Sequence, residues 1–233
     1  MPRFSRLFLL TALGLLIVGA TVGSRGQGDD KTWRADFAVD KAELSITGRG
    51  DYFILEPGFE QTLEGGNERV TIRVLDQTRI VSGVETRVIE ERETKAGELV
   101  EISRNYFAIS KRTNDVFYFG EEVDIYQNGK IVDHEGAWLA GVKGATFGLA
   151  MPGQPVLRAK YYQEIASGVA MDRSEVVSLM ETIRTPAGEF RNCLKTEETT
   201  PLEPGVKEYK YYARGVGLVQ DGALKLVKYG KVK

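Results

Sequence analysis

The side chains of this sequence that could do chemistry are mostly carboxylates, because other reactive types are scarce. The 233-residue chain contains one histidine, His134, and one cysteine, Cys193. A single imidazole excludes multi-histidine zinc sites, and a catalytic triad built on it would need a nucleophile and an orienting group supplied by the fold. The flanking residues Asp133 and Glu135 are typical of a surface loop, so we expect His134 to be a loop residue without a catalytic role.

The carboxylates form two runs. These are Glu90, Glu91 and Glu93, and then Glu121, Glu122 and Asp124. Two carboxylates facing each other across a cleft could hydrolyse a glycoside, and the second run together with Asp115 could offer oxygen ligands to calcium. Neither run has the spacing of a known motif. We therefore expect solvated strand faces and assign no catalytic residue, no metal and no cofactor.

Aromatic residues indicate a binding role more strongly than the charged ones do. Trp138, Tyr161, Tyr211 and Phe117 are our candidate ligand-binding residues, since small-molecule sites are mostly apolar with a few polar groups. The competing interpretation is that adjacent aromatic residues on a strand point to opposite faces, so that half of them fill the core.

The first twenty residues predict export. Arg3 and Arg6 precede the apolar stretch 7–18, and small residues follow it, which is the layout of a signal peptide over residues 1–20. The stretch is shorter than the roughly 18 to 20 residues that span a bilayer, so an uncleaved anchor is the alternative. No cysteine follows for lipid attachment. We expect a protein that is soluble after cleavage, located in the periplasm or outside the cell.

Composition narrows the partners further. The net charge of the whole chain is −2, and loss of Arg3 and Arg6 makes it more negative, which argues against nucleic acid as a partner. A lone cysteine means that no internal disulfide holds the chain together, and we expect Cys193 to be buried as a small apolar residue.

Short β-branched and aromatic segments, divided by turn residues at intervals of about 8–12, dominate from residue 51 onward. Residues 69–75 alternate apolar and polar side chains, and Asn128-Gly129 and Asp221-Gly222 predict hairpins. Residues 176–183 also fit helical spacing, but the context favours a strand. The loop 151–155 contains two prolines, divides the sheet into halves, and suits a crossover.

These patterns predict one all-β domain over residues 51–233, preceded by a flexible lead over residues 21–50 that can include a peripheral strand. The expected fold is a single antiparallel meander forming a curved sheet or open barrel, with little helix after the signal peptide. Two glycines in Gly215-Val216-Gly217 permit a tight bend or bulge there.

The stretch 208–219, with Tyr211-Tyr212-Ala213-Arg214-Gly215-Val216-Gly217-Leu218-Val219 at its centre, resembles the "YYAPGVGLV" ending of an uncharacterised family of exported bacterial proteins. Segments 116–121, 135–141 and 200–206 are similar to the same family, and the resemblance covers residues 50–230. Arg214 stands where that pattern often has proline. A weaker similarity, which includes 185–190, links the chain to the curved antiparallel sheet of lipoprotein-localisation factors. The family has no known activity, so the resemblance implies a fold and no site residue.

Three functions remain open. The first is non-enzymatic binding of a lipid or other apolar or amphipathic ligand within the curved sheet. The second is a structural or protein-interaction module of the cell envelope that pairs with an envelope protein through an edge strand. The third, and least favoured, is a carboxylate-dependent hydrolase.

Overall fold

The computed structural model describes residues 33–232, and nearly all of the regular secondary structure of these residues is β-strand. One 3₁₀ turn, η2 (Lys41–Glu43), is the only helical element within this described part. The signal peptide expected at 1–20 and the beginning of the lead expected at 21–50 lie outside it. No helix within residues 33–232 is both long and apolar enough to cross a bilayer.

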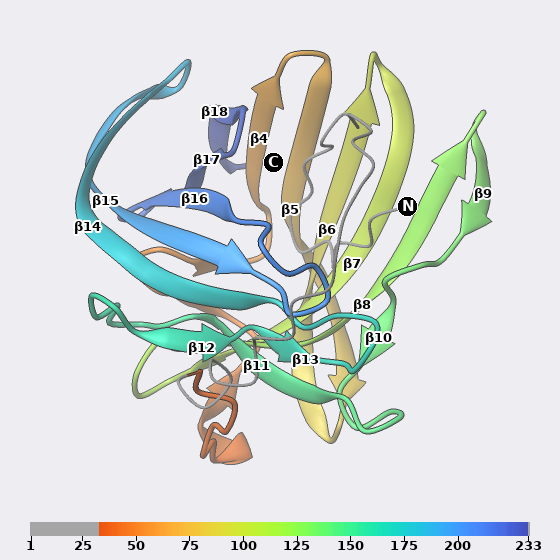
Figure 1. Cartoon of the computed structure of the whole chain (residues 1–233), viewed down its shortest axis with the longest axis vertical. Coiled ribbons are helices and arrows are strands. Elements are labelled where there is room, and N and C mark those ends of the chain that lie inside the picture. Colours follow the sequence, from red (N-terminus) through yellow and green to blue (C-terminus); the bar gives the residue numbers. More distant parts are fainter. Residues whose placement is uncertain (1–32, 233) are drawn as a thin grey trace, which may run out of the picture.

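Two antiparallel meanders of long strands make up the molecule (Figure 1). The first consists of β4 (Phe59–Gly65), β5 (Glu68–Val81), β6 (Val84–Lys95), β7 (Glu98–Ser110) and β8 (Val116–Gln127). The second consists of β14 (Arg173–Thr185), β15 (Gly188–Thr199), β16 (Glu208–Ala213), β17 (Gly217–Asp221) and β18 (Leu224–Lys231). Pairing of β18 with β4 joins the two meanders into one sheet.

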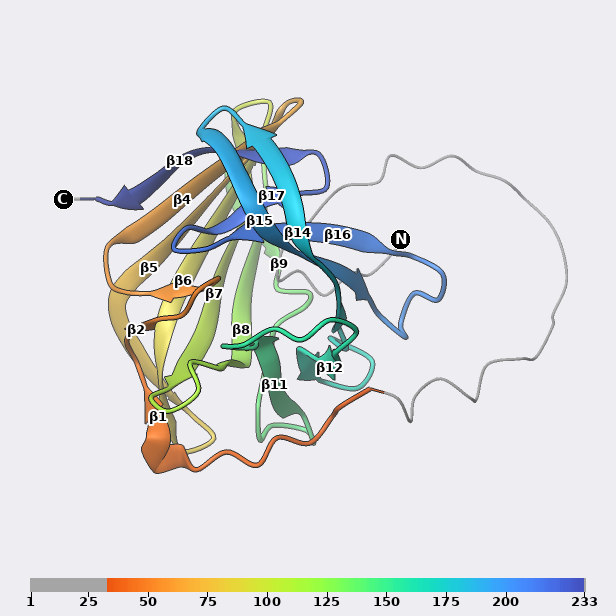
Figure 2. The same cartoon turned by 90° about the vertical axis from the view of Figure 1, so that its left-hand side faces the viewer.

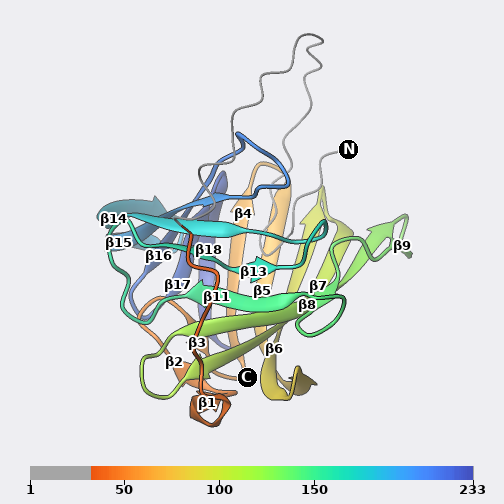
Figure 3. The same cartoon turned by 60° about the horizontal axis from the view of Figure 1, so that its bottom comes forward.

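A short segment between the meanders nearly closes this sheet into a barrel. β11 (Thr146–Met151) pairs with β8 on one side and with β13 (Glu164–Ile165) on the other. β12 (Lys160–Tyr162), only one residue before β13, pairs instead with β14 at the opposite edge. The chain therefore passes from one edge of the sheet to the other at Gln163. Figure 3 shows β13 between β14 and β11.

Smaller elements decorate the barrel. β1 (Leu44–Ser45) pairs with β7, while β9 (Lys130–Asp133) and β10 (Trp138–Leu139) pair with β8. β2 (Gly48–Arg49) and β3 (Ile54–Leu55) form a separate two-stranded sheet. The turn of the β14–β15 hairpin lies at the top of Figure 2, at about the height of the turn between β4 and β5.

The expected fold class is confirmed, and so are its clearest local signals. Asn128 and Gly129 both have positive φ, 52° and 72°, and join β8 to β9, while residues 221–222 lead from β17 into β18. Residues 176–183 lie in β14, where they pair with β15, and Met180, on the proposed helical face, is 80% exposed. Gly215 and Gly217 form the tight turn between β16 and β17.

The buried apolar side chains lie in the interior of the barrel. Apolar side chains from both meanders form one continuous core, and aromatic pairs such as Phe107–Tyr118 and Phe119–Phe147 stack with ring centres 4.8 and 4.9 Å apart. Cys193 is fully buried, as expected, and its thiol lies 3.4 Å from the carbonyl oxygen of Phe190.

The close contact between β11 and the backbone of residues 162–163, where the barrel closes, generates a first prediction. A Cβ atom at Gly148 of β11 would lie 2.4 Å from the carbonyl oxygen of Gln163 and 2.6 Å from that of Tyr162. Backbone atoms cannot move aside as a side chain can, so Gly148→Ala should separate β11 from the closing segment and lower the free energy of unfolding by about 2 kcal/mol or more. Urea denaturation measures this loss.

Gly50→Ala is the matched control, because a Cβ atom there meets nothing nearer than 3.4 Å. Equal stability of the two variants would contradict the close approach of the β11 backbone to the backbone of residues 162–163.

Candidate ligand cavity inside the barrel

Strand register determines which side chains of β4–β7 face the interior. Gln61 is paired with Ile72, and Ile72 with Glu91. Directly paired residues lie on the same face of a sheet, so these three side chains form one row across the inner wall. In the adjacent row Ile89 is paired with both Val74 and Asn105. The wall is therefore apolar, with a carboxyl group and two amides set into it.

A cavity separates this wall from the opposite one, formed by β16 and β17. It encloses about 520 Å³ of space free of protein atoms, counted up to its open mouth, of which about 40 Å³ is open to the centres of water molecules. At roughly 10–15 Å³ for each water, about three waters fit. The lining residues are Tyr52, Phe53, Ile54, Phe59, Gln61, Ile72, Val74, Ile89, Glu91, Asn105, Phe107, Tyr212, Gly217 and Leu218. A mostly apolar lining with a few polar groups is typical of small-molecule sites.

The two amide side chains of the lining are held by the protein. Gln61 donates its Nε2–H to the carbonyl oxygen of Leu218 at 2.7 Å, and a carbonyl can only accept, which fixes the orientation of this amide. Asn105 donates Nδ2–H to Ser103 Oγ at 3.0 Å and accepts the Tyr118 hydroxyl at 2.7 Å.

Gly217 is needed beside Gln61. Its φ is +92°, and a Cβ atom there would lie 3.0 Å from Gln61 Oε1. A side chain at this position would be strained in its backbone and would press on the amide. The glycine therefore allows Gln61 to span from β4 to β17 across the end of the cavity.

Glu91 is held differently from both amides. Its side chain lines the cavity and the residue is 3% exposed, yet within residues 33–232 its carboxyl group makes no hydrogen bond to protein. Burial raises the pKa of Glu91 well above its usual range, and the negative charges of Glu93 and Glu101 raise it further. The Lys210 ammonium group opposes this shift without reversing it.

Lys210 lies deeper in the interior, where it is 2% exposed and forms an ion pair with Glu198 at 2.5 Å. Burial alone would lower the pKa of Lys210, but the charges of Glu198 and Asp221 outweigh burial and hold it well above its usual range. Lys210 is therefore charged, and the Glu198 carboxylate is its direct partner.

Asp221 is paired with Lys210 in the strand register and is 2% exposed. Its Oδ1 atom has no hydrogen-bond partner among the described residues. Burial raises the pKa of Asp221 to about 8, against the opposing charge of Lys210. The interior thus combines one buried ammonium group with several carboxyl groups, and burial favours the protonated form of Glu91 and of Asp221.

The four aromatic residues that we proposed as ligand contacts lie outside this cavity. Phe117 contacts Phe37 and Phe147 edge-on, and Trp138 contacts Tyr118 in the same way. Tyr161 is 3% exposed in β12, and Tyr211 lies under Lys195 Nζ at 5.4 Å from its ring centre. Phe117, Trp138 and Tyr161 are buried in the core and Tyr211 is only partly buried against it.

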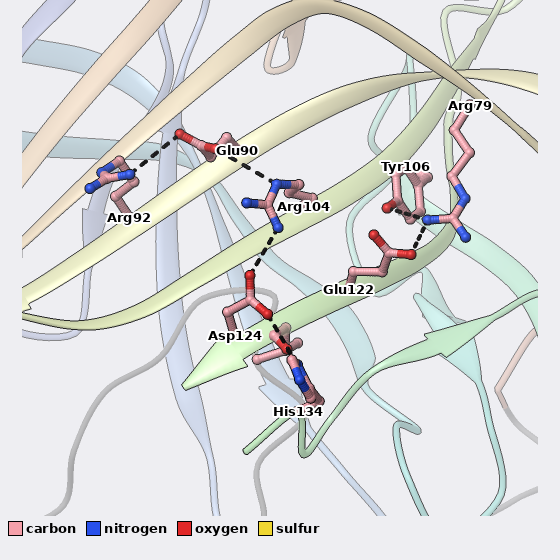
Figure 4. A network of polar contacts seen from close by, with 9 residues as sticks. Arg79, Glu90, Arg92, Arg104, Tyr106, Glu122, Asp124 and His134 are labelled. Carbon is pink, nitrogen blue, oxygen red and sulfur yellow. Dashed lines mark hydrogen bonds and ion pairs between the residues drawn. The ribbon is translucent and has the colours of Figure 1, made fainter. Parts of the chain in front are cut away.

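The two carboxylate runs are divided between the faces of the sheet, so the expectation of wholly solvated faces is wrong for Glu91 and Glu121. Glu121 is 1% exposed. Glu90, Glu122 and Asp124 lie on the outer face, where each meets an arginine (Figure 4). The reason is the two-residue period of a strand, which sends neighbouring side chains of a run to opposite faces.

His134 lies on the rim of this outer network. Its Nδ1 atom is 2.7 Å from the carbonyl oxygen of Val123 and 3.0 Å from Asp124 Oδ1, and its side chain is 66% exposed (Figure 4). Among the described residues no hydroxyl or thiol contacts the imidazole. His134 is therefore a surface residue that attaches the loop after β9 to β8.

The acidic residues considered for calcium do not gather at one point. Asp115 accepts hydrogen bonds from the backbone N–H of Gly153 and from the Thr113 hydroxyl, whereas Glu121 and Glu122 face opposite sides of β8. Within residues 33–232, no group of three or more histidine, cysteine, aspartate or glutamate side chains is arranged to hold a metal ion.

Comparison of this chain with protein-family models, with curated proteins and with solved structures finds no match.

The buried ion pair generates a second prediction. Lys210→Met leaves the Glu198 carboxylate buried without its partner, so the free energy of unfolding should fall by about 3–5 kcal/mol. Adding Glu198→Gln removes the uncompensated charge and should restore most of the loss. Urea denaturation of the single and double variants measures both effects. A loss below about 1 kcal/mol in the single variant would contradict the pairing.

Asp221 generates a third prediction, on pH. Since its pKa is raised from the ordinary 3.8 to about 8 in the folded protein, the folded state binds a proton that the unfolded state has released. Stability should therefore fall as pH rises through this window, by up to about 1.4 kcal/mol per pH unit. Asp221→Asn cannot ionise and should flatten the decline between about pH 5 and about pH 8, as measured by denaturation at each pH.

The exposed Asp36→Asn change controls for the loss of one carboxylate. An unchanged slope in Asp221→Asn would show that this carboxyl group is ionised throughout the window.

Proposed function

We propose that this protein is an exported, non-enzymatic binding protein that holds an apolar or amphipathic ligand in the cavity between its two inner walls. The observation that carries the proposal is the cavity itself, which has apolar side chains on both walls and a few polar groups at one level. Export rests on the signal-peptide pattern of residues 1–20.

The lining of the cavity favours a ligand with one apolar chain. Its walls are mostly apolar, with a few polar groups that include Glu91, Gln61 and Asn105. An unbranched alkyl chain would contact the apolar side chains while its polar end reached these groups. A lipid or a related amphiphile with one chain fits this description.

A fourth prediction tests the site. Ile72→Phe places extra volume in the cavity and should weaken binding of decanol, an uncharged single-chain probe, at least about tenfold. Isothermal titration calorimetry measures the affinity, with displacement of the fluorophore N-phenylnaphthylamine as a second readout.

Ile183→Phe is the matched control, because Ile183 and Ile72 are equally buried at 9% exposure and Ile183 does not line the cavity. The control should bind decanol as the unchanged protein does. Equal weakening in both variants would overturn the proposal, and so would the failure of single-chain amphiphiles of every charge to bind the unchanged protein.

A second function is supported by one observation. All four residues of β9 are exposed, and within the described residues β9 pairs only with β8, so its outer edge offers free backbone groups to another strand. An envelope module that pairs with a protein through β9 is therefore our alternative proposal. The hydrolase hypothesis gains no comparable support, because the outer carboxylates are paired with arginines.

A further inference from the structure

We infer that the ligand of this cavity carries a protonated amine at the end of its apolar chain, and that this ammonium group pairs with Glu91. The inference rests on the proposed function and specifies the chemistry of the ligand's polar end. It follows from the hydrogen-bonding capacity, the charge and the position of the groups that line the cavity.

Among the polar groups of the lining, the Glu91 carboxyl group leaves acceptors for a ligand. Gln61 and Asn105 each use one of their two amide N–H groups within the protein, for Leu218 and Ser103. Glu91 makes no protein hydrogen bond within residues 33–232 and lines the cavity. An ammonium group has three donors and no acceptor, which complements this arrangement.

The surrounding charges favour a cation over an anion. The ionisable groups that act on Glu91 are Glu93 of the same strand, Glu101 of β7, Asp221 of β17 and Lys210 of β16, and Glu91 itself acts on Tyr118 of β8. Lys210 is the one cation in this set, and Glu198 holds it at 2.5 Å. A ligand carboxylate would therefore meet several carboxyl groups and no uncommitted ammonium group.

The position of Glu91 fits a ligand whose two ends differ. Ile72 flanks it directly in the register, and Ile89 and Val74 occupy the neighbouring row. The side chains of Phe53, Phe59 and Phe107 complete the apolar part of the lining. A chain lying along these residues would bring its terminal group to Glu91.

Binding of the ammonium group then displaces the proton of the Glu91 carboxyl group. In the empty protein, burial raises the pKa of Glu91 well above its usual range and so favours the protonated carboxyl group. When the ammonium group arrives, the carboxyl proton leaves to solvent, and a carboxylate–ammonium pair forms in its place. Each ligand bound releases up to one proton, so affinity should rise with pH by up to about tenfold per unit while Glu91 remains protonated in the empty protein.

The test compares three probes with the same chain, namely decylamine, decanol and decanoate, on the full-length protein. At neutral pH we expect decylamine to bind at least tenfold more tightly than decanol, and decanoate to bind most weakly. Calorimetry in buffers with different ionisation enthalpies should show proton release with decylamine and none with decanol.

Glu91→Gln keeps the shape of the side chain and removes its charge, so decylamine should lose its tenfold advantage while decanol binding is unchanged. Glu90→Gln is the matched control, since it makes the same chemical change one residue away on the outer face, and it should leave all three affinities unchanged.

The outcomes separate the two proposals. Decanol binding that is blocked by Ile72→Phe, together with decylamine binding no tighter than decanol or insensitive to Glu91→Gln, would overturn the ammonium inference alone. Binding of decanoate as tightly as decylamine would also overturn it. Failure of all three probes to bind would overturn the cavity as a ligand site, and the inference with it.

Discussion

Closure of the sheet by one six-residue segment is the constraint on which the interior depends. Residues 160–162 pair with β14 and residues 164–165 pair with β11, so the two free edges of the sheet meet through Gln163. Gln163 is 3% exposed, and its backbone N–H donates to the carbonyl oxygen of Asp172 at 2.8 Å. Without this segment the sheet would be open on one side and its inner face would be hydrated. With it, the inner face is removed from water.

Burial away from water determines which ionisable side chains of the barrel interior are charged. A buried carboxylate is costly unless it is paired, so the interior stays compatible with folding either through an ion pair or through protonation. Both solutions are present, since Lys210 pairs with Glu198, while burial raises the pKa of Asp221 and of Glu91 and so favours their protonated forms. An apolar interior would be simpler to stabilise. Buried polar groups that weaken a fold are characteristic of functional sites, and Glu91 is a buried carboxyl group that lines the cavity.

The sequence was sufficient to predict the fold class but not the cavity. Asn128-Gly129 and Asp221-Gly222 predicted hairpins because positive φ is a local property of the chain, and alternation in residues 69–75 predicted one buried face. The closing strands could not be predicted, because β12 and β13 have three and two residues and carry no measurable period. The inward carboxylates were missed because alternation separates Glu90 from Glu91 without telling which face is inside, and polarity suggested solvent for both.

The walls of the cavity differ in what holds them, and this bears on how a ligand gains access. Most lining residues belong to strands whose backbones are bonded on both sides within the large sheet. Tyr52, Phe53 and Ile54 instead belong to the separate sheet of β2 and β3 or to its turn. This sheet is attached to the β16–β17 turn by the Gly215 N–H bond to the Asp51 carbonyl oxygen, at 2.7 Å, and by the Arg214–Asp51 ion pair, whose side chains are half exposed.

Exposed ion pairs contribute little stability, typically about 0–1 kcal/mol, whereas separating two long strands breaks a whole ladder of backbone bonds. Displacement of residues 48–55 would leave such ladders intact, but it would expose Tyr52, Ile54 and Leu55, which are 0–5% exposed in the core. The part of the lining outside the large sheet is thus held mainly by apolar packing, while the wall that carries Glu91 is held by backbone pairing within the large sheet. The two sides of the cavity therefore differ in the kind of interaction that a ligand would have to disturb on entry.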